Sequence, residues 1–75
     1  MDILKVVGKN IRILRQSHGY SQTDLATLAG LRRSYMGHIE RGDRNVTLTT
    51  LNRIAGALKV HPSTLLLPKV FEYEP

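Results

Sequence analysis

Residues 22–41 read QTDLATLAGLRRSYMGHIER, and this stretch decides the fold. Ala26 stands fifth in it, where two closely crossing helices need a small side chain. Gly30 stands ninth, where a tight turn between the helices needs a left-handed backbone. The positions that such a crossing buries all hold apolar residues: Leu25, Ala29, Leu31, Met36 and Ile39. The pattern predicts two short helices joined by a turn, with a polar outer face on the second.

This arrangement is typical of a helix-turn-helix, in which the second helix enters the major groove of double-stranded DNA. The expected outer face suits that task. Arg33 carries paired donors that match guanine, and Ser34 bonds either a base edge or a phosphate. We therefore predict a sequence-specific DNA-binding protein.

Helical spacing continues on both sides of the motif, and almost no stretch alternates with the period of a strand. Asp2, Ser21 and Thr47 are good N-caps, while Gly19 and Gly42 are good helix ends. The fold class is therefore all-α, a single domain of residues 1–75 with the motif as its second and third helices. We expect five helices, at about residues 2–17, 22–29, 32–41, 47–58 and 62–67.

The composition agrees with a nucleic-acid partner, because the 75 residues carry a formal charge of +5. Without cysteine there is no disulfide or thiolate site, and the three histidines lack metal-ligand spacing. The sequence holds no nucleophile–base pair, phosphate loop or acidic metal cluster, so we expect no enzyme, cofactor or metal. No apolar run is long enough for a membrane, and the start lacks the zones of a signal peptide, so we expect a cytoplasmic protein.

Two runs carry a resemblance to a known family. Ser21-Gln22-x-x-Leu25-Ala26-x-x-Ala29-Gly30-Leu31 and Ile39-Glu40-Arg41-Gly42 resemble the repressors of the lambda Cro/CI type, the XRE family. The resemblance covers about residues 7–66. It implies a compact five-helix lambda-repressor-like domain that binds pseudo-palindromic operators as a homodimer, in a bacterium or a phage, associated with the nucleoid.

A narrower resemblance lies in residues 31–47. This segment is similar to restriction–modification controller proteins, which often carry Arg-Thr-Tyr-Ile and then Ile-Glu-Arg-Gly-x-Arg-Asn; here Ser34 replaces Thr and Met36 replaces Ile. The resemblance implies control of a restriction–modification operon, including the protein's own gene. A phage-type repressor or an antitoxin remains an alternative. A protein–protein interaction module or an RNA binder on the same fold is an alternative of another class.

The expected DNA contacts fall into two groups. Arg33 is the predicted base reader, and Arg32 reaches either a base or a phosphate. Tyr35 either contacts DNA or packs against a neighbouring helix, and the exposed Gly37 either admits close approach to DNA or is simply tolerated. His38 lies one turn after Ser34 and shares its face. The predicted backbone contacts come from elsewhere: Gln22 at a helix start, Arg44 and Asn45 in the following loop, then Thr47 and Thr50.

Two further expectations concern structure and assembly. The family resemblance implies that Glu40 turns inward to an ion pair with Arg15. The apolar end of the chain is more than so small a domain easily buries, so part of residues 62–75 is predicted to form a dimer interface. Its expected members are Leu65, Leu66, Leu67, Val70 and Phe71. Further partners that we consider are a second dimer on the same operator and RNA polymerase.

Overall fold

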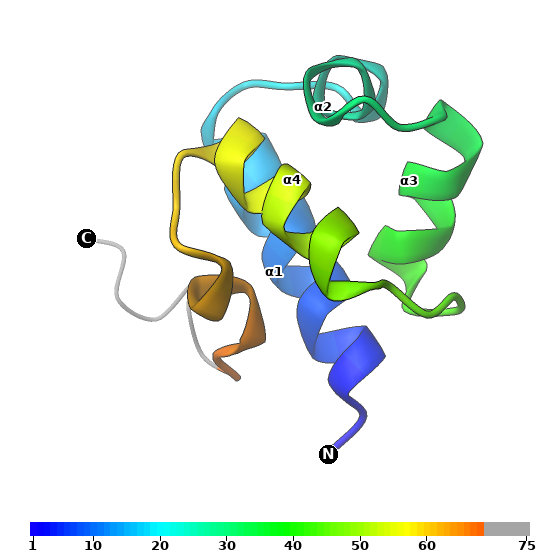
Figure 1. The fold of residues 1–75 in the computed structure, drawn as a ribbon, viewed down its shortest axis with the longest axis vertical. Coiled ribbons are helices and arrows are strands. Elements are labelled where there is room, and N and C mark those ends of the chain that lie inside the picture. The colour runs from blue at the N-terminus through cyan, green and yellow to red at the C-terminus, as the bar shows by residue number, and fades with distance from the viewer. Residues whose placement is uncertain (69–75) are drawn as a thin grey trace.

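Helix α1 (Ile3–Ser17) runs through the middle of the fold, with the other elements arranged around it (Figure 1). The computed structural model describes residues 1–68 of the chain. Three more α-helices follow α1: α2 (Gln22–Ala29), α3 (Arg33–Arg41) and α4 (Leu48–Leu58). A short 3₁₀ helix, η1 (Pro62–Leu66), then packs against α1 and α4. The predicted all-α class is confirmed for the described residues, which contain no strand.

The predicted helix boundaries depend on local bonds that the structure contains. Asp2 accepts from the amides of Leu4 and Lys5, at 3.2 and 3.3 Å, and so caps α1. Ser21 and Asp24 form a reciprocal capping box at the start of α2. Gly30 and Gly42 end α2 and α3 in the left-handed conformation, with φ of +70° and +73°. The predictions for these caps and stops are confirmed.

The prediction of a fifth α-helix is wrong, because residues 62–66 form a 3₁₀ helix instead. The His61 side chain accepts from the Ser63 amide at 3.1 Å and Pro62 opens the turn, so only five residues follow before Pro68. That length suits the tighter i→i+3 bonds better than α-helical ones. Residues 1–68 therefore form four α-helices and one 3₁₀ helix. Helix α3 also starts one residue later than predicted, since Arg32 is extended.

The core forms where the four helices and η1 meet. Leu25, Met36 and Ile39 of the motif are at most 1% exposed, as predicted, and Ala26 is 2% exposed where α2 and α3 cross. They pack with apolar residues of α1, α4 and η1, chiefly Ile11, Ile54, Leu58 and Leu65. This packing sets the angle between α2 and α3.

Two glycines bring the backbones of α1 and α3 into contact. A Cβ on Gly8 would lie 2.5 Å from the carbonyl oxygens of both Ile39 and Glu40. A Cβ on Gly42 would lie 2.9 Å from Cα of Lys5. Real Cβ atoms do not approach backbone so closely, so both positions require glycine. Helix α3 is thus held against α1 at both of these places.

Candidate nucleic-acid interface

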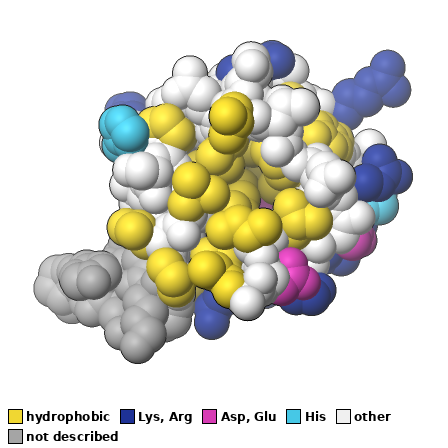
Figure 2. Space-filling model, turned by 60° about the horizontal axis from the view of Figure 1, so that its bottom comes forward, with side chains coloured by type: hydrophobic (Ala, Val, Ile, Leu, Met, Phe, Trp, Pro, Cys, Tyr) yellow, Lys and Arg dark blue, Asp and Glu magenta, His cyan; other side chains and the backbone are white. Residues whose placement is uncertain are grey.

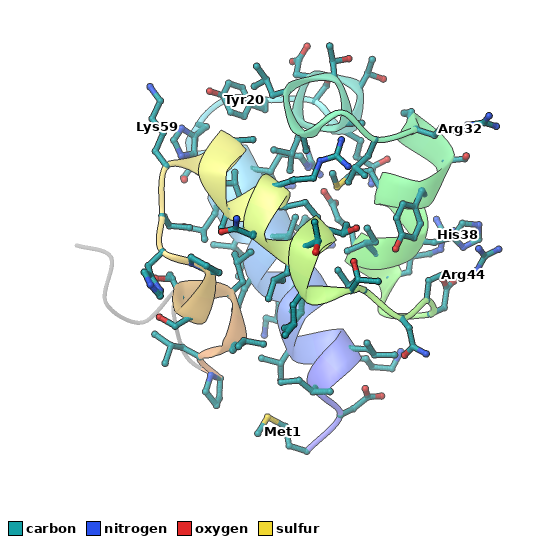
Figure 3. The ribbon with its side chains drawn as sticks, in the orientation of Figure 1. Met1, Tyr20, Arg32, His38, Arg44 and Lys59 are labelled. Atoms are coloured by element: carbon teal, nitrogen blue, oxygen red, sulfur yellow. The ribbon has the colours of Figure 1, made fainter. Side chains whose placement is uncertain are left out.

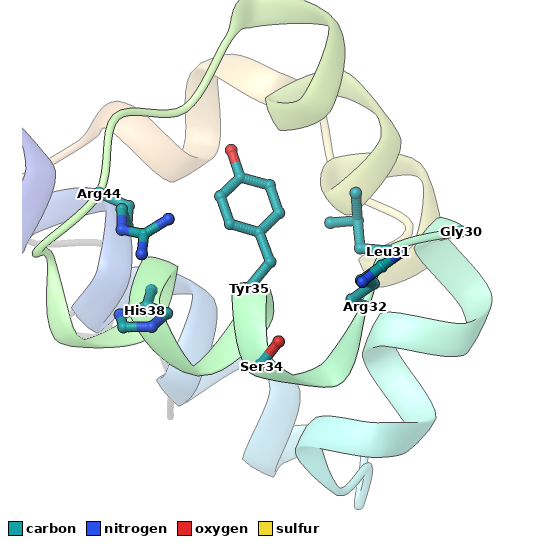
Figure 4. A pocket seen from close by; sticks show the side chains of 7 residues that line it. All are labelled: Gly30, Leu31, Arg32, Ser34, Tyr35, His38 and Arg44. Atoms are coloured by element: carbon teal, nitrogen blue, oxygen red, sulfur yellow. The ribbon is translucent and has the colours of Figure 1, made fainter.

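The outer face of α3 presents polar and basic side chains to solvent. Arg33, Ser34 and Arg41 are exposed, whereas Met36 and Ile39 on the opposite side are buried. Arg32, His38 and Arg44 extend outward on the same side of the molecule (Figure 3). Between them lies a shallow hollow, seen from close by in Figure 4. It is lined by Gly30, Leu31, Arg32, Ser34, Tyr35, His38 and Arg44.

Three of the predicted contact residues are cations without an intramolecular partner. In the part of the chain that the structure describes, no hydrogen bond or ion pair engages the guanidinium groups of Arg32, Arg33 or Arg44. An arginine that no carboxylate holds is available to phosphate oxygens or to the paired acceptors of guanine. The structure places all three on α3 or directly beside it.

Gly37 lies beneath three of the side chains on this face. A Cβ built there would be 3.4 Å from Nη1 of Arg41, 3.9 Å from Oε1 of Gln22 and 4.0 Å from Nη1 of Arg33. These are ordinary contacts with the ends of flexible side chains, so an alanine fits the free protein. The prediction that Gly37 is exposed is therefore wrong, because these side chains bury it.

We expect Gly37→Ala to stabilise the free protein by about 1 kcal/mol, since alanine is the better helix former, yet to weaken DNA binding by up to about ten-fold, because its methyl group fills the space beneath Arg33 and Gln22 and restricts their side chains. Thermal unfolding and fluorescence anisotropy with duplex DNA measure the two effects. Gly56→Ala is the matched control, because no atom lies within 4 Å of the added Cβ on exposed α4. Equal DNA affinity in both variants would contradict an approach of DNA over Gly37.

Gln22 is connected to a buried ion pair. Glu40, 3% exposed, receives two bonds from Arg15: Nε to Oε2 at 2.6 Å and Nη2 to Oε1 at 3.0 Å. Arg15 also donates to the carbonyl of Tyr20 at 2.9 Å. The Gln22 amide then donates to Oε1 of Glu40 at 3.1 Å. The ion pair that the family resemblance implies is present, and it holds Gln22 at the start of α2 beside α3.

For Tyr35 the sequence left two roles open, contact with DNA or packing inside the protein, and the structure shows the packing. Tyr35 is half-buried and packs against the core, and its hydroxyl donates to the carbonyl of Asn45 at 3.1 Å. Its ring nevertheless lines the hollow beside Ser34 and His38 (Figure 4). Tyr35 thus ties α3 to the loop that carries Arg44 and Asn45.

The remaining predicted contacts lie around the start of α4. Arg44 and Asn45 are exposed on the loop between α3 and α4. The Thr47 hydroxyl caps α4: it accepts from the Thr50 amide at 3.1 Å and donates to the Thr50 hydroxyl at 3.0 Å. Thr47 is therefore first a structural residue, and DNA contacts by Thr47 and Thr50 stay predictions.

Two residues of this surface were not predicted from the sequence, Arg41 and Asp43. The Asp43 carboxylate lies 2.9 Å from Nδ1 of His38 and accepts from Nε of Arg41 at 3.2 Å. The hydrogen bond with His38, reinforced by Arg41, lowers the pKa of Asp43 below its usual value. Arg41 was detectable, because it lies three residues after His38 on the same helical face. Asp43 returns to α3 only because Gly42 reverses the chain.

One residue predicted for the dimer interface is wrong, and the interface itself stays a prediction. Leu65 is fully buried, because its place in η1 directs it into the core, so it does not form a surface. Leu66 and Leu67 are exposed, and so are Met1, Ile3 and Leu48. Figure 2 shows apolar side chains gathered on one face of the molecule. Val70 and Phe71 lie outside the described residues.

Other kinds of site find no support within residues 1–68. No group of three histidine or acidic residues there is placed to hold a metal ion. None of the described helices combines the length and apolarity needed to cross a membrane. The hollow beside α3 is open and basic, which suits a large polyanion better than a small substrate.

A helix-turn-helix that exposes unpaired arginines on and beside its second helix is typical of a DNA-binding protein. Comparison with known families agrees: residues 11–65 match the helix-turn-helix model HTH_3, and the chain belongs to this family. It is thus a DNA-binding transcriptional regulator of XRE type, and the relatives that it matches are regulators rather than enzymes.

The relatives include restriction–modification controllers, as the sequence motifs predict. The chain is 44% identical to control protein C.SmaI of Serratia marcescens, over 88% of this chain and 79% of that one. The crystal structure of the controller C.AhdI from Aeromonas hydrophila matches with a TM-score of 0.81 and 47% identity, over 83% of this chain and 94% of that one. The biofilm master regulator SinR in complex with DNA matches with a TM-score of 0.78 and 35% identity, over 81% and 98%.

Proposed function

We propose that the protein is a homodimeric regulator that binds a pseudo-palindromic operator and controls a restriction–modification operon, including its own gene. The observation that carries the proposal is the outer face of α3, where Arg32 and Arg33 stand without a carboxylate partner beside the loop of Arg44. Similarity to C.SmaI and C.AhdI supports the kind of operon. A protein-interaction module would not need this concentration of free arginine.

Dimerisation is supported by the apolar face. Met1, Leu48 and Leu67 are 88%, 80% and 45% exposed. Exposed apolar side chains gathered on one face are typical of a surface that another protein covers. Dimers of this class read two half-sites one helical turn apart.

The proposed roles divide between reading and anchoring. Arg33 reads guanine, with Ser34 and His38 beside it on the exposed side of α3. Arg32, Arg44 and Asn45 contact the phosphate backbone around α3. The Gln22 amide group, which gives one hydrogen to Glu40, donates its other hydrogen to a phosphate at the start of α2. Thr47 and Thr50 contact a phosphate at the start of α4.

The test compares Arg33→Ala with Gln22→Ala on duplexes from the region upstream of the gene and on point variants of that region. Arg33→Ala should lose discrimination at one base pair by about 1–3 kcal/mol, because a bidentate base contact is removed. Gln22→Ala should weaken all duplexes alike. Gel shifts with scrambled competitor measure both. An Arg33→Ala protein that keeps the wild-type preference among operator variants would contradict Arg33 as reader. A wild-type protein that binds no upstream sequence preferentially would contradict the proposed function.

A further inference from the structure

The loop after α3 carries a negative charge, Asp43, within an otherwise basic surface. The described residues hold four acidic side chains: Asp2, Asp24, Glu40 and Asp43. Asp2 and Asp24 cap helices, and Glu40 is buried against Arg15. Asp43 is 47% exposed and stands next to Arg44, among the residues proposed to meet phosphates. A carboxylate there repels the DNA backbone, so a protein selected for affinity alone would not place one here.

The position of Asp43 is built by the fold. Gly42 turns the chain in the left-handed conformation, and the Asp43 amide then donates to the carbonyl of His38 at 3.2 Å. The carboxylate is thereby returned over the last turn of α3, where it meets His38 and Arg41. The side chains of all three are a third or more exposed, so the cluster lies at the surface rather than in the core.

We propose that Asp43 is a specificity-determining residue, which holds Arg41 and His38 on α3 and weakens binding to DNA of the wrong sequence. The inference rests on the proposed function, since it concerns how the same surface discriminates. Binding to non-specific DNA comes from cations that neutralise phosphates. Because Arg41 is paired with Asp43, it contributes less to that general attraction than Arg32 or Arg44.

Asp43 also orients the His38 ring. Nδ1 of His38 lies 2.9 Å from the carboxylate and 3.0 Å from Nη2 of Arg41, and one ring nitrogen cannot donate to the first and accept from the second. The carboxylate of Asp43 can only accept, so Nδ1 must carry a hydrogen to bond to it. Arg41 does not need Nδ1 as an acceptor, because its Nε already donates to Asp43. In the neutral ring Nε2 is then an acceptor, suited to the amino groups that cytosine and adenine present in the major groove.

The experiment compares Asp43→Asn with Asp2→Asn, which removes the same charge at the start of α1 and keeps a residue type that caps a helix. Non-specific affinity is measured on a duplex of arbitrary sequence over a range of salt concentrations, and sequence preference by selection from randomised duplexes. Asp43→Asn should bind the arbitrary duplex up to about five-fold more tightly, the range of an exposed ion pair. Its slope of log K against log salt should steepen by about 0.9, one additional phosphate contact. The preference for selected over arbitrary duplexes should fall by about five- to ten-fold.

A third variant isolates Arg41. In Asp43→Asn with Arg41→Ala, the salt slope should return to the wild-type value, because the released cation is gone. Asp43 is not a specificity determinant if Asp43→Asn matches Asp2→Asn in both non-specific affinity and sequence preference. If the wild-type protein selects no sequence from the pool, the proposed function is contradicted, and the proposed role of Asp43 with it.

Discussion

Arg15→Leu is expected to destabilise the protein by about 3–5 kcal/mol, because it leaves a buried carboxylate without its cation. Glu40 is 3% exposed, and its remaining partner would be the neutral amide of Gln22. The carbonyl of Tyr20 would also lose its donor. Chemical denaturation followed by circular dichroism measures the loss. At the same time Gln22 is released, so affinity for all duplexes should fall.

The matched control for Arg15→Leu removes both charges. Arg15→Leu with Glu40→Leu leaves no buried charge, and replacing a whole buried pair with apolar residues is often neutral or stabilising. The double variant should therefore recover most of the stability that the single one loses. If the double variant is as unstable as Arg15→Leu, packing by the arginine stem rather than charge compensation explains the effect. If Arg15→Leu unfolds at the wild-type denaturant concentration, the ion pair carries no stability.

Asn10→Leu is expected to cost about 2–4 kcal/mol, because two carbonyl groups lose their donor. Asn10 is 1% exposed, and its amide donates to the carbonyls of Leu65 at 2.9 Å and Leu67 at 2.7 Å. These bonds hold η1 to α1 from inside the core. Since Leu66 ends η1 and Leu67 follows it, loss of the bonds should also weaken the proposed dimer. Denaturation and sedimentation equilibrium measure the two effects.

Asn52→Leu serves as the control for Asn10→Leu, since Asn52 is exposed on α4 and the same change removes no buried bond there. It should keep both stability and assembly near the wild type. Wild-type self-association in Asn10→Leu, together with reduced stability, would show that the dimer does not use η1. Unchanged stability would mean that the two carbonyl groups find other donors.

The sequence predicted the features that depend on neighbours along the chain. Caps such as Ser21 and turns such as Gly30 satisfy backbone groups within a few residues, so residue type and spacing are enough to identify them. The burial of Leu25, Met36 and Ile39 follows from helical spacing. The pairing of Glu40 with Arg15 came from the family resemblance, because spacing alone says nothing of which cation lies opposite, and the bond from Gln22 was not predicted.

The features that were missed depend on elements brought together by folding. Nothing near Gly8 in the sequence indicates that the carbonyls of Ile39 and Glu40 lie against it. In the sequence, Asn10 looks like an ordinary polar residue on the surface of a helix, because nothing near it indicates that η1 covers it. Leu65, Leu66 and Leu67 are chemically alike, and the 3₁₀ geometry of η1 decides which one is buried. Asp43 could not be assigned to α3 before the chain reversal at Gly42 was known.

The contact of α3 with α1 through Gly8 and Gly42 has a consequence for adaptability. At these two points backbone meets backbone, with no side chain between them whose rotamer could let α3 shift. The helix proposed to read DNA is therefore held firmly against α1. Where the shape of a DNA site does not match α3, the DNA rather than the protein has to adjust, by bending or by changing the width of its grooves. Base pairs that no side chain touches would then influence affinity through the stiffness of their steps.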